Sequence, residues 1–121
     1  MNEGARVLIV DDDPEIVRML SKSLTREGFV VDAPGSPDAA LSRAESAGYD
    51  AAILDLVMPG RHGADLAAAL RARIPGLPIA LLTGYTRSPL IEAARRQPDT
   101  AVFTKPVVVS DLVDFLRSQI R

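Results

Sequence analysis

The stretch AAILDLVMPG, residues 51–60, is the most informative part of the sequence, because a single aspartate follows an apolar run in it. The four apolar residues 51–54 are typical of a short strand buried on both faces of a parallel sheet. An unpaired carboxylate is costly inside such a strand. Asp55 is therefore predicted to lie where the strand reaches a polar site at the edge of the sheet.

Short apolar runs of the same kind recur along the chain, each bounded by turn or polar residues. They predict five strands, at residues 6–10, 29–33, 51–54, 78–82 and 101–103. The segments between and after these runs carry apolar residues at helical spacing, which predicts five helices. Three helices begin with one signature, an oxygen-bearing cap followed by proline: Asp13-Pro14, Ser36-Pro37 and Ser88-Pro89.

The regular alternation of strands and helices predicts the fold class. Strands that alternate with helices are parallel, joined by right-handed crossovers, and covered by helices on both faces of the sheet. The class is a doubly wound α/β sandwich. The 121 residues, of which 47% are hydrophobic, suffice for one core. We expect one domain over residues 1–121, with no effector domain in this chain.

Composition argues against several classes of function. The 14 basic and 16 acidic residues include no basic run, and the aromatic residues are two Tyr and three Phe, so direct binding to nucleic acid is not expected. The absence of cysteine excludes disulfides, thiolate catalysis and thiolate zinc sites. The single histidine, His62, is expected to be an exposed loop residue. Without a signal peptide or an apolar run long enough to span a membrane, the expected location is the cytoplasm, with no membrane contact.

Polar residues follow four of the five predicted strands. In an open parallel sheet, ligands bind outside the carboxyl ends of the strands. Each residue alone has a structural explanation, such as a helix cap, a strand-end hydroxyl or a solvated lysine. Together they predict one polar site at this edge, built from Asp11, Asp12 and Asp13 after the first strand, Asp55 after the third, Thr83 after the fourth and Lys105 after the fifth.

The crowded carboxylates predict a metal ion. Carboxylates at one edge repel each other, and their pKa values rise unless a cation compensates them. Lys105 supplies one positive charge, and a divalent ion is the natural source of the rest. Because the available ligands are carboxylate oxygens, carbonyl oxygens and water, Mg²⁺ fits the site best.

Four segments, VLIVDDDP, AAILDLVMPGRHG, LLTGY and FTKP, resemble in this order the response-regulator receiver domain of bacterial two-component signalling. The resemblance covers essentially the whole chain, and LDLVMPGRHG is its most specific part. It implies a flavodoxin-like fold with five helices and a five-stranded parallel sheet of order 2-1-3-4-5. It also implies a phosphoacceptor in a two-component system or phosphorelay that switches a docking surface. Such a protein is not an enzyme, since it catalyses only its own Mg²⁺-dependent phosphorylation and dephosphorylation.

The resemblance assigns roles to the acidic residues. Asp55 is implied to be the phosphoacceptor, whose carboxylate attacks the phosphoryl group of a phosphohistidine and becomes an acyl phosphate. Asp12 and Asp55 are implied as direct Mg²⁺ ligands, and the main-chain carbonyl of Val57 as another. Asp11 is implied to act largely through a metal-bound water, and Asp13 keeps its capping role.

The resemblance also implies how the switch works. Lys105 pairs with Asp55 at rest and with the phosphoryl oxygens afterwards, and a cis Lys105-Pro106 bond aims it at the site. The Thr83 hydroxyl donates to a phosphoryl oxygen and moves the loop that follows it. Receivers commonly carry an aromatic residue three positions before the lysine, but this chain has Val102 there, and the neighbouring Phe103 is expected to face the other side of the sheet. The switch mechanism therefore stays open.

Several alternatives remain at this stage. A receiver fold that acts as an interaction module without phosphorylation is the main one. A haloacid-dehalogenase-like phosphatase is suggested by Asp11-x-Asp13 with Thr83 and Lys105, but it leaves Asp55 unexplained. The implied partners are a histidine kinase or phosphotransfer protein and a downstream protein target. Their identities, a homodimer, the lifetime of the phosphoryl state and membership of a longer multidomain protein are not determined by the sequence.

Overall fold

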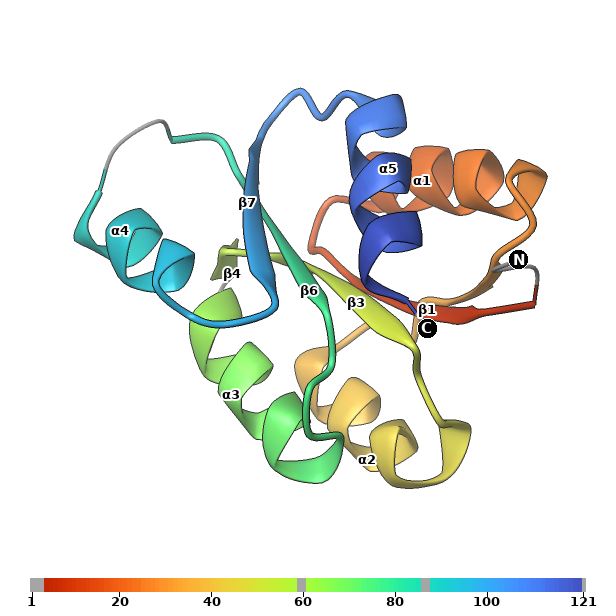
Figure 1. Cartoon of the computed structure of the whole chain (residues 1–121), viewed down its shortest axis with the longest axis horizontal. Helices are drawn as coiled ribbons and strands as arrows, with labels where there is room; N and C mark the ends of the chain where they lie inside the picture. The colour runs from red at the N-terminus through yellow and green to blue at the C-terminus, as the bar shows by residue number, and fades with distance from the viewer. Residues whose placement is uncertain (1–3, 59–60, 86–87, 121) are drawn as a thin grey trace.

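The computed structural model describes residues 4–58, 61–85 and 88–120, and a parallel five-stranded sheet crosses the middle of the molecule (Figure 1). Its neighbouring strands follow the order β2-β1-β3-β6-β7. Counted along the chain as the five strands of this sheet, that is the predicted order 2-1-3-4-5. The strands are β1 (Arg6–Val10), β2 (Val30–Asp32), β3 (Ala51–Asp55), β6 (Ile79–Thr83) and β7 (Thr100–Thr104).

Helices cover both faces of the sheet, as the fold class requires (Figure 1). On one face, α1 (Pro14–Arg26) and α5 (Val109–Gln119) bury Leu20, Leu24, Leu112 and Leu116 against Val7, Ile9, Ile53 and Leu82. On the other, α2 (Pro37–Ala47), α3 (Gly63–Arg73) and α4 (Pro89–Arg95) pack on Leu8, Leu54 and Leu81. The two apolar layers explain why β3 and β6 carry apolar residues at every position before their last one, which is Asp55 in β3 and Thr83 in β6.

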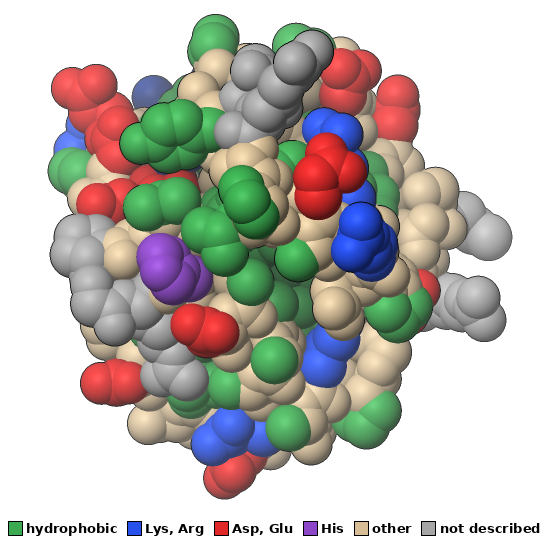
Figure 2. Space-filling view, turned by 90° about the vertical axis from the view of Figure 1, so that its left-hand side faces the viewer, with side chains coloured by type: hydrophobic (Ala, Val, Ile, Leu, Met, Phe, Trp, Pro, Cys, Tyr) green, Lys and Arg blue, Asp and Glu red, His purple; other side chains and the backbone are tan. Residues whose placement is uncertain are grey.

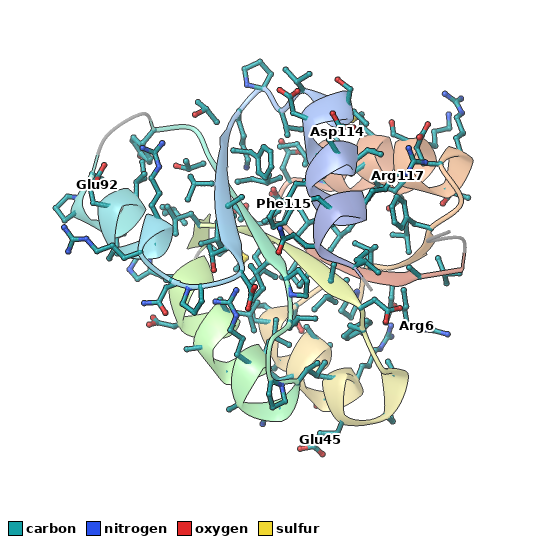
Figure 3. All side chains as sticks on the ribbon, viewed as in Figure 1. Arg6, Glu45, Glu92, Asp114, Phe115 and Arg117 are labelled. Carbon is teal, nitrogen blue, oxygen red and sulfur yellow. The ribbon has the colours of Figure 1, made fainter. Side chains whose placement is uncertain are left out.

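The side chains of β7 alternate between these two layers. Val102 packs with the α2–α3–α4 layer, and Phe103 packs with the α1–α5 layer. The ring of Phe103 meets the ring of Phe115 edge to face, with centroids 5.8 Å apart, and Figure 3 shows Phe115 on the side of α5 that faces β7. The prediction that Phe103 faces away from the Val102 side is confirmed.

The three predicted helix caps are confirmed. The side-chain oxygen of Asp13 accepts a hydrogen bond from the Glu15 N–H (3.0 Å). Ser36 accepts from the Ala39 N–H and Ser88 from the Ile91 N–H, both at 3.1 Å. In each helix a proline follows the cap, where its missing N–H leaves no hydrogen bond unmade.

The local predictions were wrong for the second strand and for the segment that follows β3. The second strand is Val30–Asp32 rather than 29–33, because the Phe29 N–H donates to the Leu24 carbonyl of α1 (3.1 Å) and its ring enters the core. A short antiparallel pair, β4 (Val57–Met58) with β5 (Arg61–His62), was not predicted. His62 is exposed as expected, but it lies in β5 and not in a loop.

Within the described residues, no helix has the length and apolar character needed to cross a bilayer.

Candidate functional site

The carboxyl ends of four strands bring the predicted site residues together. Asp11 and Asp12 follow β1, Asp55 ends β3, and Thr83 ends β6. Lys105 follows β7 and is held beside Thr83, because its N–H donates to the Thr83 carbonyl at 2.7 Å. Since β3 lies between β1 and β6 in the sheet, Asp55 occupies the middle of the group.

Three carboxylates form a cluster at this edge. Asp11, Asp12 and Asp55 each offer one carboxylate oxygen, and these oxygens lie within 4.8 Å of one another. Asp55 is 6% exposed, the Asp11 side chain is 1% exposed, and Asp12 lies at the surface. The cluster is therefore open to solvent on the Asp12 side and closed beneath Asp11 and Asp55. Asp13 caps α1 instead, so the second aspartate of the phosphatase-like pattern is not in this cluster.

Lys105 is shared between two of the carboxylates. Its Nζ lies 3.1 Å from Asp11 Oδ2 and 3.5 Å from Asp55 Oδ2, so the ammonium bridges Asp11 and Asp55 and does not pair with Asp55 alone. The Lys105-Pro106 bond is cis, as the resemblance implied. Asp11 Oδ2 is buried, and the Lys105 ammonium is the charged group beside it.

The charges in the cluster change the protonation of its members. Burial, together with a hydrogen bond to Asp12 and the charge of Asp11, raises the pKa of Asp55 to about 6, while Lys105 and the Val57 N–H pull it down. Burial disfavours the ammonium of Lys105, but Asp11 and Asp55 outweigh it, and its pKa is raised. One ammonium thus offsets only part of the negative charge.

The turn after β3 fixes the position of Asp55 through a glycine. The Gly63 N–H donates to the Leu56 carbonyl (2.7 Å), which brings the first residue of α3 against the backbone of Asp55. A Cβ at position 63 would lie 2.2 Å from the Asp55 carbonyl oxygen and 2.9 Å from Leu56 Cα. This is the last glycine of LDLVMPGRHG, whose spacing is visible in the sequence although its contact with the backbone of Asp55 is not.

Val57 and Thr83 both lie near Asp55, one along the chain and the other at the end of the neighbouring strand. The N–H of Val57 lies 3.4 Å from Asp55 Oδ1, and the residue is 40% exposed. The Thr83 hydroxyl is 1% exposed, and its oxygen accepts a hydrogen bond from the Tyr85 N–H (3.0 Å). Tyr85 itself is 64% exposed, so the Thr83–Tyr85 turn couples a buried hydroxyl to a surface ring.

Comparison with known sequences identifies the family to which this site belongs. The family model described as the response regulator receiver domain matches residues 7–117. The chain belongs to this receiver-domain family. The receiver is a module of two-component response regulators, which agrees with the resemblance seen in the sequence.

Individual relatives agree with the assignment. The DNA-binding response regulator MtrA of Mycolicibacterium smegmatis is 34% identical over 116 residues, which cover 96% of this chain and 50% of MtrA. The transcriptional regulatory protein TcrA of Mycobacterium tuberculosis is 35% identical over 80 residues, covering 66% of this chain and 32% of TcrA. This receiver thus spans from about a third to a half of the length of these curated relatives.

A solved structure supports the fold. The chemotaxis protein CheY4 of Vibrio cholerae is 28% identical and superposes with a TM-score of 0.86, over 97% of this chain and 99% of the compared chain. The predicted flavodoxin-like architecture is therefore confirmed both by the topology of the sheet and by this likeness.

Proposed function

We propose that this receiver accepts a phosphoryl group on Asp55 from the phosphohistidine of a histidine kinase or phosphotransfer protein. The observation that carries the proposal is the placement of Asp55: a buried carboxylate at the end of the central strand, beside two further carboxylates and 3.5 Å from the ammonium of Lys105. A cluster needed only for stability would not gather three carboxylates around one lysine, because like charges at this distance repel.

The proposed reaction is a displacement at phosphorus. An oxygen of the Asp55 carboxylate attacks the phosphorus, the phosphorus–nitrogen bond of the phosphohistidine breaks, and its electron pair returns to the imidazole. The product is an acyl phosphate on Asp55. Lys105, already within ion-pair distance of Asp55, is placed to follow the negative charge onto a phosphoryl oxygen.

The residues of the cluster fit a hard divalent ion, and we propose Mg²⁺. Asp11, Asp12 and Asp55 supply three oxygens within 4.8 Å of one another, and the ammonium of Lys105 lies beside two of these carboxylates. Asp12 and Asp55 are proposed as direct ligands together with the Val57 carbonyl, with Asp11 reaching the ion largely through water. When bound, Mg²⁺ would neutralise the negative charge that otherwise keeps a phosphoryl donor away from these carboxylates.

The proposed switch runs through Thr83. At rest its oxygen accepts from the Tyr85 N–H, so the hydroxyl hydrogen can be donated elsewhere. After phosphorylation, donation to a phosphoryl oxygen would draw Thr83 inward and pull the turn that leads to α4. Because Val102 replaces the common aromatic residue, we propose that this turn, with the exposed Tyr85, carries the signal to a downstream protein target.

The cellular setting is also a proposal. A histidine-kinase or phosphotransfer partner and a protein target in the cytoplasm suit a signalling module that acts on no external substrate. DNA binding appears in the description of the relative MtrA, of which this chain spans half. For the residues in hand, which include no basic run, we propose no direct contact with nucleic acid.

Intact-protein mass spectrometry tests the proposal. The chain is incubated with acetyl phosphate, with and without Mg²⁺. We expect a single phosphoryl adduct that requires the metal and is lost in Asp55→Asn. Asp13→Asn is the matched control, because asparagine is an equally good cap and Asp13 lies outside the cluster. An adduct that survives in Asp55→Asn would move the acceptor to another residue, and no adduct with any donor would favour the phosphorylation-independent module.

A further inference from the structure

A groove separates α3 from α4 on the face shown in Figure 2, where hydrophobic side chains surround a hollow. Its volume is about 300 Å³, at the lower end of the range for small-molecule sites. Most of the lining residues are apolar and three are polar. The apolar residues are Ala64, Ala67 and Ala68 from α3, Leu90, Ala93 and Ala94 from α4, and Leu81 from β6; the polar residues are Arg71, Gln97 and Thr100.

The groove exists because both helices present small side chains to it. Alanines on facing helices leave the space that larger residues would fill. α4 packs on β7, whereas α3 packs on α2, β3 and β6, so each helix has its main contacts with elements other than its neighbour across the groove. The groove shares no residue with the carboxylate cluster.

Arg71 gives this apolar groove a positive charge. Its Nε donates to the Leu77 carbonyl (3.2 Å), and its Nη2 donates to the Asp99 carbonyl (2.9 Å) and the Thr100 hydroxyl (2.7 Å). All three acceptors are uncharged, and they use three of the five N–H donors of a guanidinium. Over the described ranges, the hydrogens on Nη1 have no acceptor in the protein.

The charge of Arg71 is only weakly compensated. Burial lowers the pKa of the guanidinium, and the Asp99 carboxylate opposes that effect from a longer range. Among the residues that the structure describes, none forms a carboxylate ion pair with Arg71. A half-buried guanidinium beside apolar walls is complementary to a ligand with one anionic group and an apolar body.

We propose that the α3–α4 groove binds a small monocarboxylate with an apolar body, whose carboxylate pairs with Nη1 of Arg71 while its apolar part lies between the alanines of the two helices. This site shares no residue with the proposed phosphoacceptor site, and the inference does not rest on phosphorylation of Asp55.

Titration followed by nuclear magnetic resonance tests the proposal. The ¹⁵N-labelled chain is titrated with sodium octanoate and, separately, with 1-octanol, which has the same apolar body without the charge. We expect saturable shifts of the backbone amides of Ala67, Ala68 and Ala93, with octanoate binding about tenfold or more tightly than 1-octanol, as a charge-assisted contact provides.

Two variants separate binding from folding. Ala68→Leu fills the groove from an exposed helix position and leaves Arg71 in place, so it should keep the native spectrum and lose the octanoate shifts. Ala72→Leu, an exposed position of α3 that does not line the groove, is the matched control and should bind like the wild type. Arg71→Lys keeps the charge without the planar fork and should weaken octanoate binding several-fold.

Three outcomes would overturn the proposal. Equal affinity for octanoate and 1-octanol would remove the selectivity for an acid. Shifts that map elsewhere, or that persist in Ala68→Leu, would place any binding outside the groove. In the third outcome, neither compound binds, sedimentation shows a concentration-dependent dimer, and the concentration-dependent amide shifts map to α3 and α4. The groove would then be an interface between two copies of the chain.

Discussion

At the scale of single residues, Gly63 has the clearest physical requirement. The space for a Cβ is taken by the backbone of Asp55 and Leu56, and backbone cannot move aside as a flexible side chain can. The Gly63→Ala variant should therefore lose about 3 kcal/mol of unfolding free energy, the upper end of the cost of overpacking. Alanine also makes the unfolded chain less flexible than glycine does, and this effect recovers only about 0.4–1 kcal/mol of the lost unfolding free energy.

Urea denaturation measures this loss as a lower midpoint at an unchanged slope. Gly84→Ala is the control, because a Cβ there meets nothing within 4 Å and the stability should stay within about 0.5 kcal/mol of wild type. Equal stability of Gly63→Ala and wild type would mean that α3 can shift away from Asp55, and that glycine is not needed for the contact.

Tyr49 links stability to alkaline pH. Its buried hydroxyl (the residue is 3% exposed) donates to Asp32, whose other oxygen accepts from Arg43 at 2.6 Å. Burial and the hydrogen bond to Asp32 raise the pKa of Tyr49. Because the folded pKa is above the unfolded value of about 10, the contribution is complete below pH 10 and is lost as the pH rises beyond it.

The Tyr49→Phe variant isolates this contribution. It should lose about 1.5–2 kcal/mol at pH 7, since the bond is to a charged acceptor. Its stability should also decline less steeply than that of wild type between about pH 10 and 11. Thermal unfolding of both proteins across pH 7–11 measures the difference, and parallel curves would show that the phenol does not control the alkaline loss.

At the scale of elements, capping residues were readable from the sequence because a cap is a local event. The oxygen of Ser36 satisfies an N–H of the first turn of α2, and no distant residue takes part. Ser36→Ala should therefore cost about 1 kcal/mol, whereas Ser36→Asp should retain the stability. The control is Ser42→Ala, at an exposed position within α2, where alanine should be neutral or slightly stabilising. Equal losses in both alanine variants, measured in urea, would contradict a role specific to the cap.

Other elements depend on contacts that a local pattern cannot reveal. The pair β4–β5 has two residues in each strand, too few to show an alternating pattern. The second strand was predicted too long because Phe29 has the apolar character of a strand residue, while its N–H completes the end of α1. Arg71 joins α3 to residues 77, 99 and 100 through acceptors that become neighbours only in the folded chain.

At the scale of the whole molecule, the sequence predicted the sheet and the convergence of the site residues, because topology alone brings the ends of parallel strands to one edge. It did not predict how charge is divided there. The sharing of Lys105 between Asp11 and Asp55 follows from side-chain geometry, which strand order does not determine. The sequence likewise did not predict that the Tyr85 N–H donates a hydrogen bond to the Thr83 hydroxyl oxygen.

The carboxylate cluster should lower the free energy of unfolding of the metal-free protein. Three carboxylates lie close together in it, those of Asp11, Asp12 and Asp55. The ammonium of Lys105 lies between Asp11 and Asp55. Asp12→Asn removes one negative charge at an exposed position without changing the size of the side chain. In a chelator the variant should therefore be more stable than wild type by about 1 kcal/mol, because a like-charge contact is removed.

Mg²⁺ should make wild type more stable than Asp12→Asn, which reverses the order expected in a chelator. An ion that binds only the folded state adds stability that grows with its concentration, about 1.4 kcal/mol for each tenfold excess over the dissociation constant. Wild type should gain this increment and Asp12→Asn, which lacks a proposed ligand, should gain little, so the two curves of melting temperature against Mg²⁺ cross. Asp13→Asn, outside the cluster, should follow wild type throughout. Curves that stay parallel would mean that Asp12 does not bind the ion. A crossing would mean that Asp12, whose charge destabilises the metal-free protein, contributes to binding the ion.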